Sequence, residues 1–166
     1  MNNNSIAKPL SDDDVSKLMK KISLCTKEEI TELSNIFVEF SNTLNSIISI
    51  ALDQAKDSGD EEDITELERA RRIIGMCPLE EKLIRVKDKV WNVHEHIINK
   101  NAKFFLDRDY SGMIKKDQNK AFIEALMEIV KNNFEDLPKE HQDHYWKKAK
   151  KLVKLVAKFK KIIKDF

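Results

Sequence analysis

Residues 26–60 read TKEEITELSNIFVEFSNTLNSIISIALDQAKDSGD, and this stretch decides the fold class. Apolar residues recur along it at alternating spacings of three and four: Ile30, Leu33, Phe37, Phe40, Leu44, Ile47 and Ala51. This period is that of one face of an α-helix. Thr26 and Glu29 have the spacing of a capping box, and the polar run around Gly59 ends the pattern. The stretch therefore predicts one long, heptad-patterned helix at about 27–57.

The apolar surface of this helix is wider than the seam of a two-stranded coiled coil. Four further apolar residues lie beside the main stripe: Ile36, Ile48, Ile50 and Leu52. A wide stripe is buried against several neighbours, so we expect the helix to be the spine of an antiparallel bundle within one chain. A coiled-coil-like homodimer is the alternative interpretation of the same heptads.

Helix-breaking residues are scarce along the whole chain. The 166 residues include only 3 glycines and 3 prolines, which argues against a turn-rich β-sandwich and against glycine-rich phosphate-binding loops. Helical periodicity predicts further helices at about 11–24, 61–74 and 79–106, around 121–130, and from Pro138 onward. We therefore predict an all-α, single-domain bundle of five to six helices at 11–166, preceded by a flexible tail at 1–10.

One loop between predicted helices, at residues 107–114, reads DRDYSGMI. This spacing resembles the first eight positions of an EF-hand calcium loop. In such a loop, side-chain oxygens from alternate positions and one backbone carbonyl converge on calcium, and a glycine permits the sharp turn. The resemblance implies a calcium site formed by Asp107, Asp109, Ser111 and the backbone carbonyl of Met113.

Two departures from the EF-hand pattern lower the calcium affinity expected of this loop. The last position, where the family has a bidentate glutamate, is Gln118, and Lys115 stands three positions before it. The chain therefore lacks the strongest ligand and adds a cation beside the site. We therefore expect an interhelical turn that needs no ion, and no cofactor for the chain; calcium bound by this loop is the alternative.

The C-terminal segment is strongly basic, although the net charge of the chain is only +1. Residues 141–166 hold 9 lysines and 2 aspartates, whereas residues 1–75 carry a net charge of −6. Apolar residues lie between the lysines at helical spacing, so about 138–166 should form a basic amphipathic helix. The candidate partner-binding residues are Trp146, Lys147, Lys151, Lys154, Lys158 and Lys161.

A basic amphipathic helix can bind several kinds of anionic surface. We expect an acidic protein partner; electrostatic binding of nucleic acid and binding to an anionic membrane surface are the alternatives. Only 5 of the 30 basic residues are arginine, which argues against sequence-specific reading of DNA. The remaining interpretation is a helix that completes the bundle and leaves a solvated lysine side.

No combination of residues indicates catalysis. The sequence contains no HExxH, CxxC or Glu-x-x-His motif and no evident pairing of a nucleophile with a base. We therefore predict a non-enzymatic interaction or assembly protein. A calcium-responsive EF-hand-like module and an electrostatic nucleic-acid-binding protein are the alternative functions.

The composition also bears on source and location. Lysine, isoleucine and asparagine, which have AT-rich codons, are abundant, so we expect an AT-rich genome and a role such as that of a virion or effector component. There is no signal-peptide core and no apolar run long enough for a membrane helix, and Cys25 and Cys77 are the only cysteines. These features predict a soluble, intracellular protein, located in the cytoplasm, the host cytoplasm or a virion.

Overall fold

The computed structural model describes residues 12–108 and 122–164, which form eight α-helices and no β-strand. The helices are α1 (Asp12–Ser23), α2 (Lys27–Ser58), α3 (Glu61–Met76), α4 (Leu79–Asn92), α5 (His94–Ile98), α6 (Ala102–Leu106), α8 (Phe122–Phe134) and α9 (Lys139–Ile162). The all-α prediction is confirmed. Across the described residues, no helix has the length and apolar character needed to cross a membrane. The predicted tail at 1–10 lies outside them.

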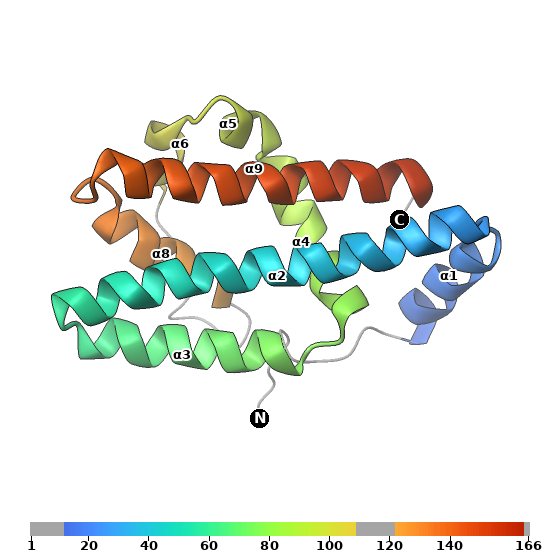
Figure 1. The fold of residues 1–166 in the computed structure, drawn as a ribbon, viewed down its shortest axis with the longest axis horizontal. Helices are drawn as coiled ribbons and strands as arrows, with labels where there is room; N and C mark the ends of the chain where they lie inside the picture. Colours follow the sequence, from blue (N-terminus) through green and yellow to red (C-terminus); the bar gives the residue numbers. More distant parts are fainter. Residues whose placement is uncertain (1–11, 109–121, 165–166) are drawn as a thin grey trace.

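The long helix α2 is the spine of the bundle. Figure 1 shows α3, α2 and α9 as three roughly parallel rods with α2 in the middle, and α4 and α8 also pack against α2. Packing on several neighbours explains the wide apolar stripe, since Ile36, Ile48 and Leu52 are all buried. Ile30, in the first turn, departs from the predicted stripe and is 41% exposed.

Both ends of α2 lie where the sequence predicts them, because both carry the expected capping groups. The Thr26 hydroxyl accepts a hydrogen bond from the Glu29 amide (3.1 Å), and the Glu29 carboxylate accepts one from the Thr26 amide (2.9 Å). Gly59 has a φ of 72°, and its amide donates to the carbonyls of Ala55 and Lys56. These bonds satisfy backbone groups that a helix end otherwise leaves without partners.

The predicted end of the third helix is wrong by two residues. Gly75 lies inside α3, which continues to Met76 before the backbone becomes extended at Cys77. Proline disfavours helical backbone in the residue before it, so Pro78 rather than Gly75 determines where α3 ends. Pro78 then precedes the first turn of α4, as its fixed φ allows.

The helix predicted at 79–106 is divided into α4, α5 and α6. The chain leaves helical geometry at Val93 and again before Asn101, where Lys100 has a positive φ of 51°. The Asn101 side chain then accepts a hydrogen bond from the Phe104 amide (3.3 Å) and starts α6. The apolar periodicity continues across both breaks, which is why it predicted a single helix.

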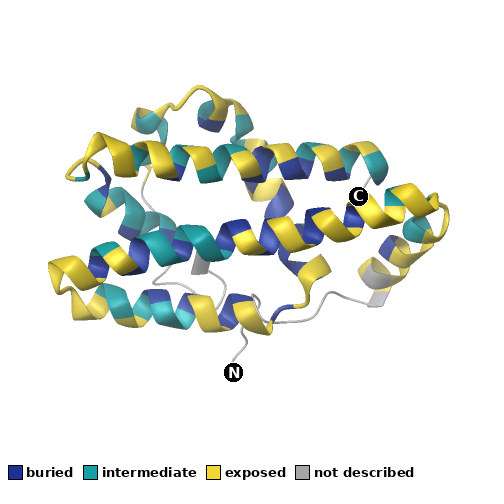
Figure 2. Cartoon of the chain, in the orientation of Figure 1, coloured by how far each residue is buried: buried dark blue, intermediate teal, exposed yellow. Residues whose placement is uncertain are grey.

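The core contains two clusters of buried side chains along α2. The N-terminal half of α2 packs with α1, α4, α5 and α9 around Phe40 and Phe159, which are both fully buried. The C-terminal half packs with α3 and α8 around Ile48 and Leu67. Ile47 contacts both clusters. Figure 2 shows the resulting alternation of buried and exposed residues along α2 and α9.

Candidate functional site

The predicted basic helix is α9, whose 24 residues begin directly after Pro138. Its apolar side is buried in the bundle: Tyr145, Leu152, Val153, Leu155, Val156 and Phe159. The rings of Phe159 and Phe37 of α2 have centroids 6.1 Å apart. The hydrophobic side of α9 is therefore part of the core, and its polar side faces solvent.

The lysine face of α9 comprises Lys147, Lys151, Lys154, Lys158 and Lys161, all of them exposed. Alternating spacings of four and three place them on one stripe about 21 Å long. From the first to the last of these residues, the helix carries eight lysines and no acidic residue. In the part of the chain that the structure describes, the side chains of the lysine face form no hydrogen bond or ion pair. The structure thus places the five predicted lysines on one exposed stripe of α9.

Trp146, the sixth predicted partner-binding residue, lies apart from the lysine face. Its half-buried ring has its centroid 6.0 Å from that of Phe105 and 5.9 Å from that of Phe134. The predicted site residues do not include Phe105 or Phe134. The adjacent aromatic residues Phe104 and Phe105 are the local signal that could have indicated a contact site. Their proximity to Trp146 depends on how α6 and α8 pack against α9.

Most of the predicted calcium loop lies outside the described residues, including Asp109, Ser111 and Met113. Asp107 is described, and its carboxylate accepts a hydrogen bond of 2.7 Å from the Lys103 ammonium on an exposed surface. This hydrogen bond raises the pKa of Lys103. No group of three or more His, Cys, Asp or Glu residues suited to a metal ion occurs within 12–108 and 122–164. Calcium binding by the loop stays a prediction from the sequence.

The two histidines of α5 have separate aromatic partners. His94 stacks on Trp91 with ring centroids 4.2 Å apart, and its Nδ1 lies 2.6 Å from the Trp91 carbonyl oxygen. His96 stacks on Phe104 with ring centroids 3.7 Å apart. Packing therefore holds the two imidazoles in different surroundings.

Comparison with protein-family models, with curated proteins and with solved structures finds no match to this chain. The lysine face therefore has to be interpreted from its own geometry and charge.

Proposed function

We propose that this chain is a non-enzymatic helical protein that binds an acidic protein partner through the lysine face of α9. The observation that supports the proposal is the division of α9 into two sides. One side is buried in the core, whereas the other is exposed and has no acidic residue between Lys147 and Lys161. Carboxylates of a partner are attracted to such a surface over roughly 8–10 Å at physiological salt.

The lysine face is carried by a helix that other helices hold in place. α9 packs against α2, α4 and α5, so the stripe of ammonium groups has a fixed backbone over its whole length. A partner that binds this surface orders side chains but not a backbone segment. The entropic cost of association is therefore smaller than for a flexible basic tail.

Two features favour an acidic protein over nucleic acid. α9 contains no arginine, the residue that makes bidentate contacts with phosphate. Its aromatic residues, Tyr145, Trp146 and Phe159, are buried or half-buried, so the helix offers no exposed aromatic platform on which bases could stack.

An intracellular location is part of the proposal. Cys25 is half-buried and Cys77 is buried, and both are free thiols. Free thiols are typical of proteins from reducing compartments. An assembly component inside a cell or a virion would meet this condition.

The experiment is a charge reversal of the lysine face, with poly-L-glutamate as the acidic probe. The variant carries Lys147→Glu, Lys151→Glu, Lys154→Glu and Lys158→Glu. We expect its affinity for poly-L-glutamate, measured by fluorescence anisotropy, to fall at least about tenfold, because attraction becomes repulsion at four positions. Its helical circular dichroism should be retained, since the four side chains are exposed.

A control variant makes the same change in net charge at exposed lysines on other surfaces: Lys20→Glu, Lys27→Glu, Lys56→Glu and Lys139→Glu. It should bind poly-L-glutamate within about threefold of the unmodified protein, because the lysine face is intact. Equal loss in both variants would show that only net charge matters. Tighter binding of duplex DNA than of poly-L-glutamate at the same salt would favour the nucleic-acid alternative and contradict the proposal.

A further inference from the structure

The exposed side chains at one end of the bundle are mainly acidic. The turn between α2 and α3 and the turn between α8 and α9 both lie at this end, which is on the left in Figure 1. We call residues 56–62 and 135–140 the acidic end. They hold seven acidic side chains, all of them exposed, and two lysines, so the net charge of this surface is −5.

The carboxylates of the acidic end are poorly compensated by the rest of the molecule. In the described part of the chain, none of the seven forms an ion pair. Asp57 lies in the last turn of α2, where the negative end of the helix dipole disfavours a further negative charge. Burial raises the pKa of the Asp63 carboxyl in the first turn of α3, and the carboxylates of Asp60 and Glu62 raise it further. Cations from outside the chain would therefore stabilise this surface.

The lysine face of the same molecule is too far away to supply most of these cations. The ring centroids of Phe37 of α2 and Phe159 of α9 are 6.1 Å apart. The Tyr145 hydroxyl, in the other half of α9, donates a hydrogen bond of 2.8 Å to the Gln54 side-chain oxygen. The two helices are thus antiparallel, and the acidic end lies beside the first turns of α9. Lys158 is about 20 Å further along the helix axis than Tyr145, well beyond the screening length of roughly 8–10 Å.

The distribution of charge favours contact between copies of the chain. The net charge of the whole molecule is only +1, so two copies repel one another little. Their surfaces nevertheless carry strong charges of opposite sign, on the lysine face and at the acidic end. One copy can therefore bring to another the cations that its own fold keeps away from the acidic end.

We propose that the acidic partner of the lysine face is the acidic end of a second copy of this chain. The inference rests on the proposed function, since it names the protein that the lysine face binds. Lys154, Lys158 and Lys161 of one copy lie against the carboxylates of the acidic end of the other. Exposed ion pairs contribute little each and are screened by salt, so the association is weak and depends on protein concentration.

The first experiment measures the mass of the unmodified protein by analytical ultracentrifugation. In about 0.02 M salt, the weight-average mass should exceed the 19.4 kDa of one chain and rise with protein concentration up to about 1 mM. In about 0.5 M salt it should return to 19.4 kDa, because charges are then screened within about 4 Å. A mass of 19.4 kDa throughout the low-salt series would overturn the proposal, as would association that salt does not weaken.

The second experiment reverses the charge of each surface. The lysine-face variant is the charge reversal described above, and the acidic-end variant carries Asp57→Lys, Glu62→Lys, Glu135→Lys and Asp136→Lys. Each variant alone should be monomeric in about 0.02 M salt, because its two surfaces have charges of the same sign. A chain with both sets of substitutions again has surfaces of opposite sign and the original net charge, so it should associate as the unmodified protein does. A folded chain with both sets that remained monomeric would contradict the proposal.

A matched control separates specific pairing from an effect of net charge. It combines the lysine-face reversal with four charge reversals at exposed acidic residues on other surfaces: Glu32→Lys, Glu39→Lys, Glu80→Lys and Glu95→Lys. Its net charge and number of substitutions equal those of the chain with both surfaces reversed, but its lysine face and its acidic end are both negative. It should be monomeric in about 0.02 M salt. Equal association of these two chains would show that the contact does not involve the acidic end.

The third experiment locates the contact without any substitution. A carbodiimide joins a lysine directly to a carboxylate, and mixing unlabelled protein with heavy-isotope-labelled protein identifies the cross-links between copies by mass spectrometry. We expect cross-links of mixed isotope between Lys158 or Lys161 and Glu62 or Asp136. Cross-links between copies that join these lysines only to acidic residues outside the acidic end would overturn the proposal.

This inference and the proposed function can fail separately. Poly-L-glutamate binding is measured at micromolar protein, where a weak self-association is not populated. Unmodified protein that bound poly-L-glutamate but stayed at 19.4 kDa in the low-salt series would refute a second copy as the partner and leave the proposed function intact. The acidic-end variant should retain its affinity for poly-L-glutamate, because its lysine face is unchanged.

Discussion

The ammonium group of Lys82 donates a hydrogen bond of 2.8 Å to the hydroxyl of Ser41, and this bond joins α4 to α2 inside the bundle. Ser41 is only 4% exposed and Lys82 only 9% exposed. A buried ammonium has lost most of its hydration, so the Ser41 oxygen replaces water as its acceptor. The bond links residues 41 positions apart, and it positions α4 against the spine.

Removing the acceptor should therefore destabilise the fold. We expect Ser41→Ala to lower the free energy of unfolding by about 1.5–3 kcal/mol, the range for hydrogen bonds to charged groups. Urea denaturation followed by circular dichroism measures this change. In the background of Lys82→Met, which removes the charge, Ser41→Ala should cost less than about 1 kcal/mol. An equal cost in both backgrounds would show that the two residues are not coupled.

Gly59 and Gly75 should respond in opposite directions to the same substitution. Gly59 has a φ of 72°, a conformation that strains an L-residue, so Gly59→Ala should destabilise the protein by about 1–2 kcal/mol. Gly75 lies inside α3 with nothing within 4 Å of an added Cβ, so Gly75→Ala should stabilise it by about 0.5–1 kcal/mol. Thermal melts of the two variants make the comparison. A loss of stability in Gly75→Ala would contradict the helical position of that residue.

Burial of Tyr145 should make the stability of the protein sensitive to alkaline pH. Desolvation raises the pKa of its hydroxyl above the ordinary value of 10.0. Above that pH the unfolded chain releases the phenolic proton and the folded chain retains it, so stability is full below pH 10 and falls as the pH rises further. The loss from this one group approaches about 1.4 kcal/mol per pH unit.

Tyr145→Phe isolates this contribution from that of other groups. It should cost about 1 kcal/mol near neutral pH, because the hydrogen bond to Gln54 is lost. Its stability should then decline less steeply than that of the unmodified protein above pH 10. If the free energies of unfolding of the two proteins, measured by urea denaturation, fell equally above pH 10, the pKa of Tyr145 would not be raised in the folded protein.

The two cysteines should differ in reactivity towards a disulfide reagent such as Ellman's reagent. Burial raises the pKa of both thiols, but Cys77 is only 7% exposed, whereas Cys25 is half-buried. We expect Cys77 to react at least about tenfold more slowly, because modification requires local opening. Cys77→Ala should remove the slow phase and leave the fast one. Two equally fast phases would contradict the buried position of Cys77.

The spine of the fold could be predicted because its signals are local. Thr26 with Glu29, the apolar stripe and Gly59 all lie within one segment, and together they locate α2 to within one residue of its observed end. The divisions of the segment from 79 to 106 could not be predicted in the same way. The divisions depend on Lys100, which has a left-handed backbone conformation. The asparagines on either side of it favour a turn, but this signal is weaker than the helical periodicity of the apolar residues, which continues across the breaks.

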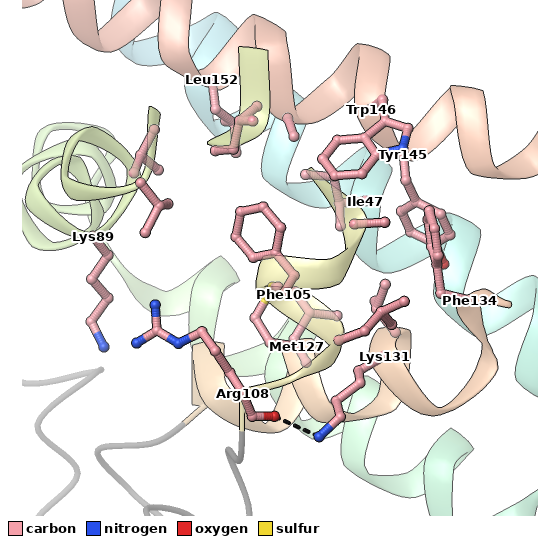
Figure 3. A pocket seen from close by; sticks show the side chains of 18 of the residues that line it. Ile47, Lys89, Phe105, Arg108, Met127, Lys131, Phe134, Tyr145, Trp146 and Leu152 are labelled. Carbon is pink, nitrogen blue, oxygen red and sulfur yellow. Dashed lines mark hydrogen bonds between the residues drawn. The ribbon is translucent and has the colours of Figure 1, made fainter. Parts of the chain in front are cut away.

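The candidate site, too, could be predicted only where its signals are local in the sequence. The lysine face could be predicted, because exposed lysines at helical spacing form one stripe whatever the rest of the fold does. The surroundings of Trp146 could not, because Phe105 lies 41 positions earlier in the chain and its approach depends on tertiary packing. A pocket whose described walls come from α2, α4, α5, α6, α8 and α9 (Figure 3) could be predicted even less, because these helices must all be packed before it exists.

The continuity of α2 has a consequence for how the protein unfolds. A helix of 32 residues, about 48 Å long, carries one core cluster on each half, and Ile47 packs against both. Loss of either cluster removes tertiary support from one end only, and an unsupported helix frays from its free end. The order in which the amides of α2 exchange with solvent would therefore show which half of the protein unfolds first. Amide exchange in this one helix thus reports on the stability of both core clusters.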